Sequence, residues 1–131
     1  MSETSSLEEQ SEYTDAFALL REGRYDKAAL AFQTFLKRHG TGKYADNARY
    51  WLGESYYVTR DFPASMEQFQ SLLAQFPQSP KAAGAQLKIG FIHHELGQMD
   101  EARQALAILV ERYPKTTAAR LARDRLKRLA N

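Results

Sequence analysis

The side chains best suited to bind a metal ion or to take part in catalysis lie in one short run, His93, His94 and Glu95. Imidazole and carboxylate groups bind transition metals when several of them converge on one point. Neighbouring residues of a helix point in different directions, however, and the H-E-x-x-H spacing of zinc proteases is absent. We therefore expect no metal site and no cofactor at this run.

No other pattern in the sequence indicates catalysis. It contains no phosphate-binding loop, no nucleophile elbow and no pair of carboxylates in shared apolar surroundings. The absence of cysteine excludes a disulfide framework and thiol chemistry. We predict that the protein is not an enzyme.

Basic residues gather near the C-terminus. They are Arg120, Arg123, Arg125, Lys127 and Arg128. The cluster lacks the interleaved aromatic residues of a nucleic-acid site, and the net charge of the 131 residues is only +2. We interpret the cluster as the solvated outer face of a terminal helix, with an acidic partner protein as the alternative, and we expect no nucleic acid.

The elements that position these side chains recur along the sequence with a step of 37 residues. Size and polarity are kept at each step, as in Ala28, Ser65 and Ala102, or in Phe32, Phe69 and Leu106. Each unit contains two helical patterns, and a proline or glycine follows the second as a stop signal. A repeat of this length is typical of stacked helix pairs.

Small residues mark one position of each first helix, namely Ala16, Gly53 and Gly90. Glycine costs about 1 kcal/mol relative to alanine within a helix, so its presence there requires a packing reason. We expect the two helices of a pair to approach closely at this position. The sequence predicts that an aromatic ring of a neighbour lies against the backbone there.

The pattern resembles the tetratricopeptide repeat. Its signature is matched by Leu52, Gly53, Tyr56, Gly97, Ala102 and Pro114. The sequence departs from it at Asp15, Arg60 and His93, where leucine, glycine and tyrosine are usual. The resemblance implies an all-α fold, a right-handed superhelix of three tetratricopeptide helix pairs plus a C-terminal capping helix.

The same step assigns the ends of the chain. Ala119, Ala122 and Leu126 fall in register with the first helices, but Lys127 replaces the glycine, so no second helix needs to approach. Stacked repeats need such a solvated cap. We expect a flexible N-terminal segment at residues 1–11, repeats at 12–40, 45–77 and 82–114, and the capping helix at 117–130.

One face of the first helices is a candidate binding groove. Its residues are Tyr13, Phe17, Leu20, Tyr50, Glu54, Tyr57, Leu87, Lys88, Phe91 and His94. Apart from Lys88, they are spaced by four and then three positions in each helix, which places each set on one face. This face is distinct from the packing face of Leu52 and Tyr56. An exposed apolar patch of this kind marks an interaction site, and simple packing is the alternative.

Some tetratricopeptide domains grip a C-terminal carboxylate with lysine and asparagine on this face. Here those positions hold Tyr50, Glu54 and Phe91. This departure argues against a chaperone-tail adaptor.

The longer sequence runs are similar to the C-terminal domain of the YbgF/CpoB family of Tol-Pal periplasmic proteins. The YWLG run at 50–53, the F-x-x-SP-K-A run at 76–82 and the final A-x-x-RL-type helix carry this likeness. It implies a protein that binds TolA, with a peptidoglycan synthase complex as a further candidate partner. It also implies a role in coordinating outer-membrane constriction with peptidoglycan synthesis during cell division.

Members of that family carry a signal peptide and a trimerising coiled coil, and we expect both to be missing from this chain because it is a fragment. The resemblance then implies a periplasmic protein without direct membrane insertion, trimeric at full length. Two alternatives stay open. One is an outer-membrane assembly lipoprotein scaffold of the BamD type, and the other is a cytoplasmic tetratricopeptide adaptor.

Overall fold

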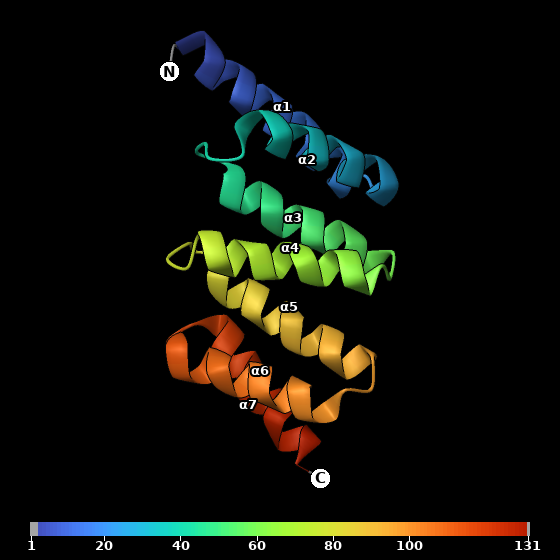
Figure 1. Ribbon diagram of the computed structural model, residues 1–131, viewed down its shortest axis with the longest axis vertical. Helices are drawn as coiled ribbons and strands as arrows, with labels where there is room; N and C mark the ends of the chain where they lie inside the picture. Colours follow the sequence, from blue (N-terminus) through green and yellow to red (C-terminus); the bar gives the residue numbers. More distant parts are fainter. Residues whose placement is uncertain (1–2, 131) are drawn as a thin grey trace. The chain divides into compact units, whose positions relative to one another are not determined.

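Every regular element of the described residues is an α-helix, which confirms the all-α prediction (Figure 1). The computed structural model describes residues 3–130, and side chains from residue 6 onward. The helices are α1 (Glu3–Arg21), α2 (Tyr25–His39), α3 (Ala45–Val58), α4 (Phe62–Gln75), α5 (Ala82–Glu95), α6 (Met99–Arg112) and α7 (Thr117–Leu129). None of these helices has the length and apolarity needed to cross a membrane.

The chain divides into two compact units. Unit 1 is Met1–Gln68 and contains α1, α2, α3 and the first half of α4. Unit 2 is Phe69–Asn131 and contains the rest of α4 with α5, α6 and α7. The expected boundaries between repeats stay a prediction.

Helix α1 differs from the flexible segment expected at residues 1–11, because residues 3–11 are helical and residues 1–2 lie outside the described part. A contact with the loop after α2 holds this part of the helix at Glu9, and contacts with α2 hold the next residues at Glu12. Glu9 is 2% exposed, and its Oε1 accepts a hydrogen bond of 3.3 Å from the backbone N–H of Tyr44. Glu12 pairs with both Arg38 and His39, and its Oε2 lies 2.8 Å from His39 Nε2.

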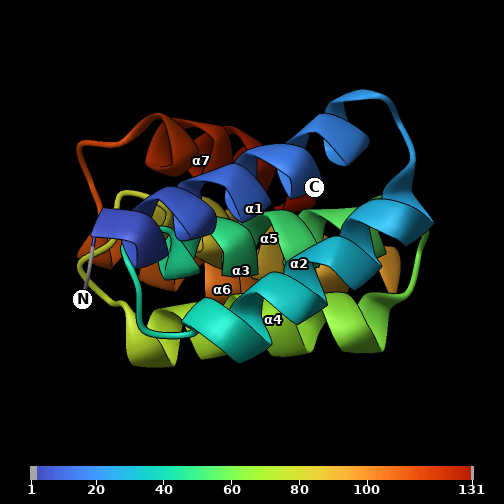
Figure 2. The same cartoon turned by 90° about the horizontal axis from the view of Figure 1, so that it is seen from above.

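The core of unit 1 forms where α1, α2 and α3 meet. Figure 2 shows α1 and α2 running in opposite directions. The stripe of apolar residues on α2 buries Phe32 and Phe35 completely, and Leu52 of α3 joins the same cluster at 2% exposure. The helical periodicity of the sequence therefore identifies the side chains that form this core.

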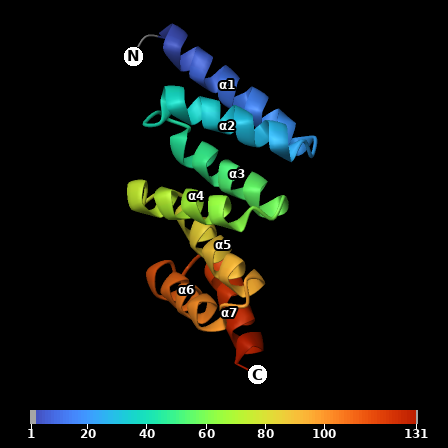
Figure 3. The same cartoon turned by 45° about the vertical axis from the view of Figure 1, so that its right-hand side comes forward.

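The core of unit 2 is built by three helices, because α7 packs against both α5 and α6 (Figure 3). Leu87, Leu106, Leu109 and Ala122 form its buried centre. Thr116 caps the start of α7, since its Oγ1 accepts a hydrogen bond of 3.1 Å from the backbone N–H of Ala119. Burial of Leu87 under this arrangement affects the candidate site, as described below.

A close helix approach occurs at Gly90, but the side chain beside it is aliphatic rather than aromatic. A Cβ added to Gly90 would lie 2.6 Å from Cδ2 of Leu106 and 3.8 Å from the carbonyl oxygen of Ala102. Carbon atoms normally pack 3.5–4.0 Å apart, so an added methyl group would require the Leu106 side chain to move. The expected aromatic neighbour is wrong for this pair of helices because α6 carries leucine at the position where α2 carries Phe32.

The turn within each helix pair places one residue in the left-handed region of backbone space. These residues are Gly23, Arg60 and Gly97, with φ values of 76°, 65° and 75°. They are 37 residues apart, so the arginine occupies a position that the other two pairs give to glycine. Arg60 thus adopts a conformation that costs a residue with a Cβ about 1–2 kcal/mol.

Candidate functional site

The part of the predicted groove in unit 1 is a cluster of aromatic rings. We call it the unit 1 face and define it as Tyr13, Phe17, Leu20, Tyr50, Glu54 and Tyr57. All six side chains are partly buried. The structure brings these residues of α1 and α3 into one unit, and whether they bind a partner stays a prediction.

The rings of α1 pack towards the core. Tyr13 stacks on Tyr44 with ring centroids 4.9 Å apart, and its other contacts include the edges of Phe32 and Phe35. Phe17 meets Trp51 edge to face at 5.3 Å. For Tyr13 and Phe17, simple packing therefore accounts for part of the apolar character of the unit 1 face.

The rings of α3 continue this cluster. Tyr50 meets Trp51 edge to face at 5.0 Å, and Tyr57 meets Phe62 of α4 in the same way at 5.7 Å. The four aromatic residues of the unit 1 face therefore each pack against another ring. Aromatic pairs of this kind are worth about 0.5–1.5 kcal/mol beyond the area that they bury. The cluster is thus a rigid surface whose partly exposed members can receive an apolar group.

Burial further favours the neutral form of two phenols in this cluster, Tyr13 and Tyr50. Desolvation raises the pKa of Tyr50 to about 12, and the nearby Glu54 carboxylate adds to the effect. Burial also raises the pKa of Tyr13 above its usual value. Both side chains therefore retain an O–H donor at physiological pH, and neither offers a base or nucleophile for catalysis.

The part of the predicted groove in unit 2 is more covered than expected. Leu87 is 7% exposed and belongs to the core that α7 closes, so it is not accessible to a partner. The guanidinium of Arg125 lies 4.5 Å from the centre of the Phe91 ring, and Arg125 Nη1 is 3.4 Å from His94 Nδ1. We call Lys88, Phe91, His94 and Arg125 the unit 2 face.

This placement corrects one expectation about the basic residues near the C-terminus. Arg125 does not lie on a solvated outer face but is partly buried against α5. Arg123 is exposed and donates a hydrogen bond of 2.8 Å to the carbonyl oxygen of Pro114. The reason is that α7 packs on the side of α5 that was expected to be exposed, and Arg125 lies on the side of α7 that meets α5.

Sequence reasoning missed Arg125 of the unit 2 face, and Tyr44 and Trp51, whose rings pack against the unit 1 face. Trp51 occupies the same repeat position as Thr14, Lys88 and Arg125, which are 37 residues apart, so no constant residue type marks the position. Tyr44 lies in the loop before α3, outside any helical stripe. The adjacency of Tyr50 and Trp51 in one run was the available signal.

The two faces present aromatic rings and cationic groups. In the described residues, no group of three or more His, Cys, Asp or Glu side chains could hold a metal ion. His93 is engaged by Gln98, with His93 Nδ1 2.7 Å from Gln98 Oε1. The arrangement offers aromatic surface in unit 1 and a cationic rim around one aromatic ring in unit 2.

Relatives of known identity share parts of the sequence or the fold. The chain is 48% identical over 42 residues to the cell division coordinator CpoB of Pseudomonas putida, a match that covers 32% of this chain and 16% of that protein. The chain therefore spans only a small part of this relative's length. Over that stretch, the predicted resemblance to CpoB is confirmed.

Solved structures share the fold at low sequence identity. PcrH, solved in complex with the chaperone-binding region of PopD, superposes with a TM-score of 0.82 at 15% identity, covering 99% of this chain and 94% of that chain. The second tetratricopeptide domain of human RPAP3, solved with an HSP70 peptide, has a TM-score of 0.77 at 14% identity, covering 96% and 98%. Tetratricopeptide repeat models match residues 13–80 and 84–116, and the chain belongs to the tetratricopeptide repeat family.

Proposed function

We propose that this chain is a protein-interaction module of the bacterial cell envelope that binds TolA through the unit 1 and unit 2 faces. In this role it helps to coordinate outer-membrane constriction with peptidoglycan synthesis during cell division, in the periplasm. A peptidoglycan synthase complex is a further partner. The full-length protein would act as a trimer.

The observation that carries the binding proposal is the cluster of partly exposed rings around Tyr50. Aromatic side chains are enriched among the residues that dominate binding energy at protein interfaces. Rings fixed by their neighbours lose little conformational freedom when a partner binds, which favours affinity. Tyr50, Trp51 and Tyr57 meet both conditions, because each is partly exposed and each packs against a neighbouring ring.

The unit 2 face supplies charge to the same function. Arg125 lies over Phe91, and Lys88 occupies the equivalent position one repeat earlier. A carboxylate of the partner placed beside Arg125 and His94 would gain a charge-assisted hydrogen bond. Such contacts adjust association rate and salt dependence more than affinity.

Similarity to CpoB supports the cellular setting. The relative's name assigns it to cell division, and the two sequences share almost half of the aligned positions over 42 residues. The solved relatives PcrH and RPAP3 were both captured with a segment of another protein. Other proteins with this fold thus bind a segment of a partner protein.

The proposal is tested by titrating purified TolA into the chain and into variants of the two faces. Tyr50→Ala and Phe91→Ala should each weaken binding by about thirtyfold, the loss expected for about 2 kcal/mol at an anchor. Tyr50→Phe keeps the ring and should bind almost normally. Val58→Ala, which changes an exposed side chain of the same helix α3, serves as the matched control.

Circular dichroism must show that each variant is folded. Unchanged affinity in folded Tyr50→Ala and Phe91→Ala would exclude both faces as the TolA site. Failure of the unaltered chain to bind TolA would refute the partner itself.

A further inference from the structure

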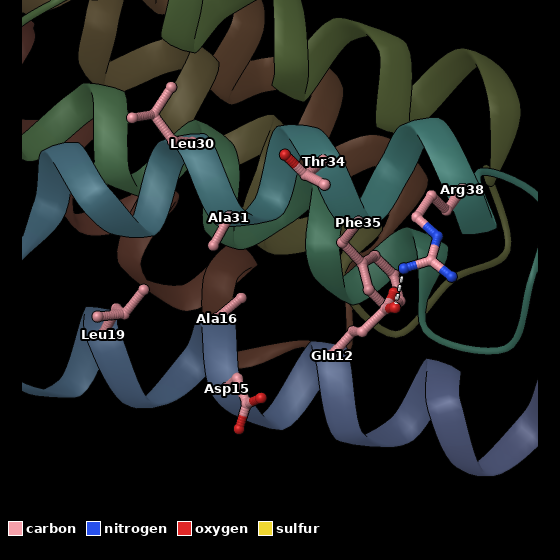
Figure 4. Close-up of a pocket in the computed structure, with 9 residues that line it drawn as sticks. All are labelled: Glu12, Asp15, Ala16, Leu19, Leu30, Ala31, Thr34, Phe35 and Arg38. Atoms are coloured by element: carbon pink, nitrogen blue, oxygen red, sulfur yellow. Dashed lines mark hydrogen bonds and ion pairs between the residues drawn. The ribbon is translucent and has the colours of Figure 1, made fainter.

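A separate groove lies between α1 and α2 (Figure 4). Its volume is about 430 Å³, and its floor is made by the small or apolar side chains of Ala16, Leu19, Ala31 and Phe35. In the close-up, Ala16 and Leu19 point towards α2, while Ala31 and Phe35 point towards α1. The ion pair of Glu12 with Arg38 closes one end.

The two rims of this groove carry side chains that differ from their counterparts elsewhere in the chain. Asp15 stands on the α1 rim, where the next two repeats have Leu52 and Ile89. Leu30 stands on the α2 rim and is 63% exposed, where the next two repeats have Glu67 and Gln104. The apolar and the polar rim are therefore exchanged in the first repeat.

The second repeat shows what covers such a groove. Within unit 1, α2 packs against α3, where Leu36 and Lys37 of α2 line the same crevice as Leu52. Gln33 of α2 donates a hydrogen bond to the hydroxyl of Tyr56. Tyr56 is the counterpart of Leu19, one step of 37 residues later. A helix thus fills the position in the second repeat that the described part of unit 1 leaves uncovered in the first.

We propose that the groove between α1 and α2 is a docking site for one amphipathic helix of another protein, with the pattern Leu-x-x-Lys-Leu. The lysine faces Asp15, the adjacent leucine covers Leu30, and the first leucine covers Leu19. This pattern keeps the spacing of Gln33, Leu36 and Lys37 in α2, with the order of leucine and lysine at the last two positions exchanged as the two rims are exchanged. The site is separate from the unit 1 and unit 2 faces and extends the proposed function with a third surface.

Charge and exposure select this occupant. Among the described residues, no cation pairs with the exposed carboxylate of Asp15, so an incoming lysine has a partner and an incoming leucine does not. Burying a leucine against Leu30 removes apolar surface from water, whereas the charged end of a lysine there does not. The exchanged rims therefore favour a partner helix with the order Lys-Leu over one with the order Leu-Lys.

The experiment uses two synthetic helical peptides of identical composition in an alanine-rich host. One carries Leu-x-x-Lys-Leu and the other Leu-x-x-Leu-Lys, the second order being that of α2 itself. Each is titrated into the chain labelled with ¹⁵N, and amide shifts are followed by NMR. The unaltered chain should prefer the Lys-Leu order by about tenfold, the sum of one exposed ion pair and one leucine contact.

Matched variants exchange the rims back. Asp15→Leu combined with Leu30→Glu recreates the Leu52 and Glu67 pattern and should reverse the preference of the chain for the two peptides. The preference of the unaltered chain should decrease as sodium chloride is added, because salt screens an exposed ion pair. Tyr50→Ala should leave peptide binding unchanged, which separates this site from the proposed TolA faces.

Any of four results would overturn the proposal. The first is no binding of either peptide, and the second is equal binding of both orders by the unaltered chain. The third is a set of shifted amides outside α1 and α2. Sedimentation that reveals self-association lost in the Leu30→Glu variant would assign the groove to a second copy of this chain and so reject a separate partner helix.

Discussion

A methyl group added at Gly90 tests how closely α5 and α6 pack. The added Cβ would lie 2.6 Å from Cδ2 and 2.9 Å from Cγ of Leu106. Normal contact between carbon atoms is 3.5–4.0 Å, so Leu106 must move by about 1 Å. Leu106 is 0% exposed and shares a buried cluster with Leu87 and Leu109, which leaves it no vacant space to enter.

Two opposing terms set the size of the effect. Overpacking of a buried site costs typically about 1–3 kcal/mol. Replacement of glycine by alanine within a helix contributes about 1 kcal/mol in the opposite direction. Gly90→Ala should therefore lower the free energy of unfolding by about 1 kcal/mol, although alanine is the better helix former.

A double-mutant cycle identifies the atom responsible. Leu106→Ala alone should cost about 2–5 kcal/mol, because it leaves a cavity in the core. In that background the clash is gone, so adding Gly90→Ala should stabilise the protein by up to about 1 kcal/mol. The expected sign reversal corresponds to a coupling energy of about 2 kcal/mol, within the range for residues in contact.

Urea unfolding followed by far-ultraviolet circular dichroism measures all four proteins. Stabilisation by Gly90→Ala in the unaltered background would show that the two helices leave room for a methyl group. An equal loss in both backgrounds would show that Leu106 is not the obstacle. Either result would refute the interpretation of Gly90 as a position of obligatory close approach.

Further changes test other features of the chain. Arg60→Gly should raise the free energy of unfolding, measured with urea, by up to about 1 kcal/mol, because glycine adopts a φ of 65° without strain. A lower free energy of unfolding would show that the contact of Arg60 with the Phe62 ring, 4.9 Å away, outweighs the backbone strain. The pKa of Tyr50 is about 12 in the folded chain and about 10 in the unfolded chain, so the free energy of unfolding should fall between about pH 10 and 12. Thermal melts of Tyr50→Phe should show a smaller fall over this pH range, and an equal fall would contradict the assignment to Tyr50. Gly42→Ala should displace the Glu9 carboxylate and expose the backbone N–H of Tyr44 to faster hydrogen exchange, and unchanged protection would mean that the loop can adapt.

Local patterns in the sequence determine the helices and much of each core. Phe32 and Phe35 are buried because a helix of period 3.6 brings them to one face, and this spacing is visible without the fold. The step of 37 residues located Gly90 as a small residue between two helices, and the structure places Leu106 beside it. Such features depend on residues that are close in sequence or that recur at a constant interval.

The accessibility of the candidate faces was decided by tertiary structure. A helical pattern gives the direction of a side chain but does not identify which other helix covers it. Leu87 was expected on an open face, and it is buried because α7 packs on α5. The aromatic surface likewise includes Tyr44 and Trp51, which no repeated position marks.

The groove between α1 and α2 shows the same division. Asp15 was visible in the sequence as a departure from the usual leucine, but its meaning depended on Leu30 standing on the opposite rim. These two residues come from different helices, so only their packing places them around one groove. The sequence by itself determined the helices and their register; tertiary packing decided which faces are left open, because burial depends on contacts between elements distant in the chain.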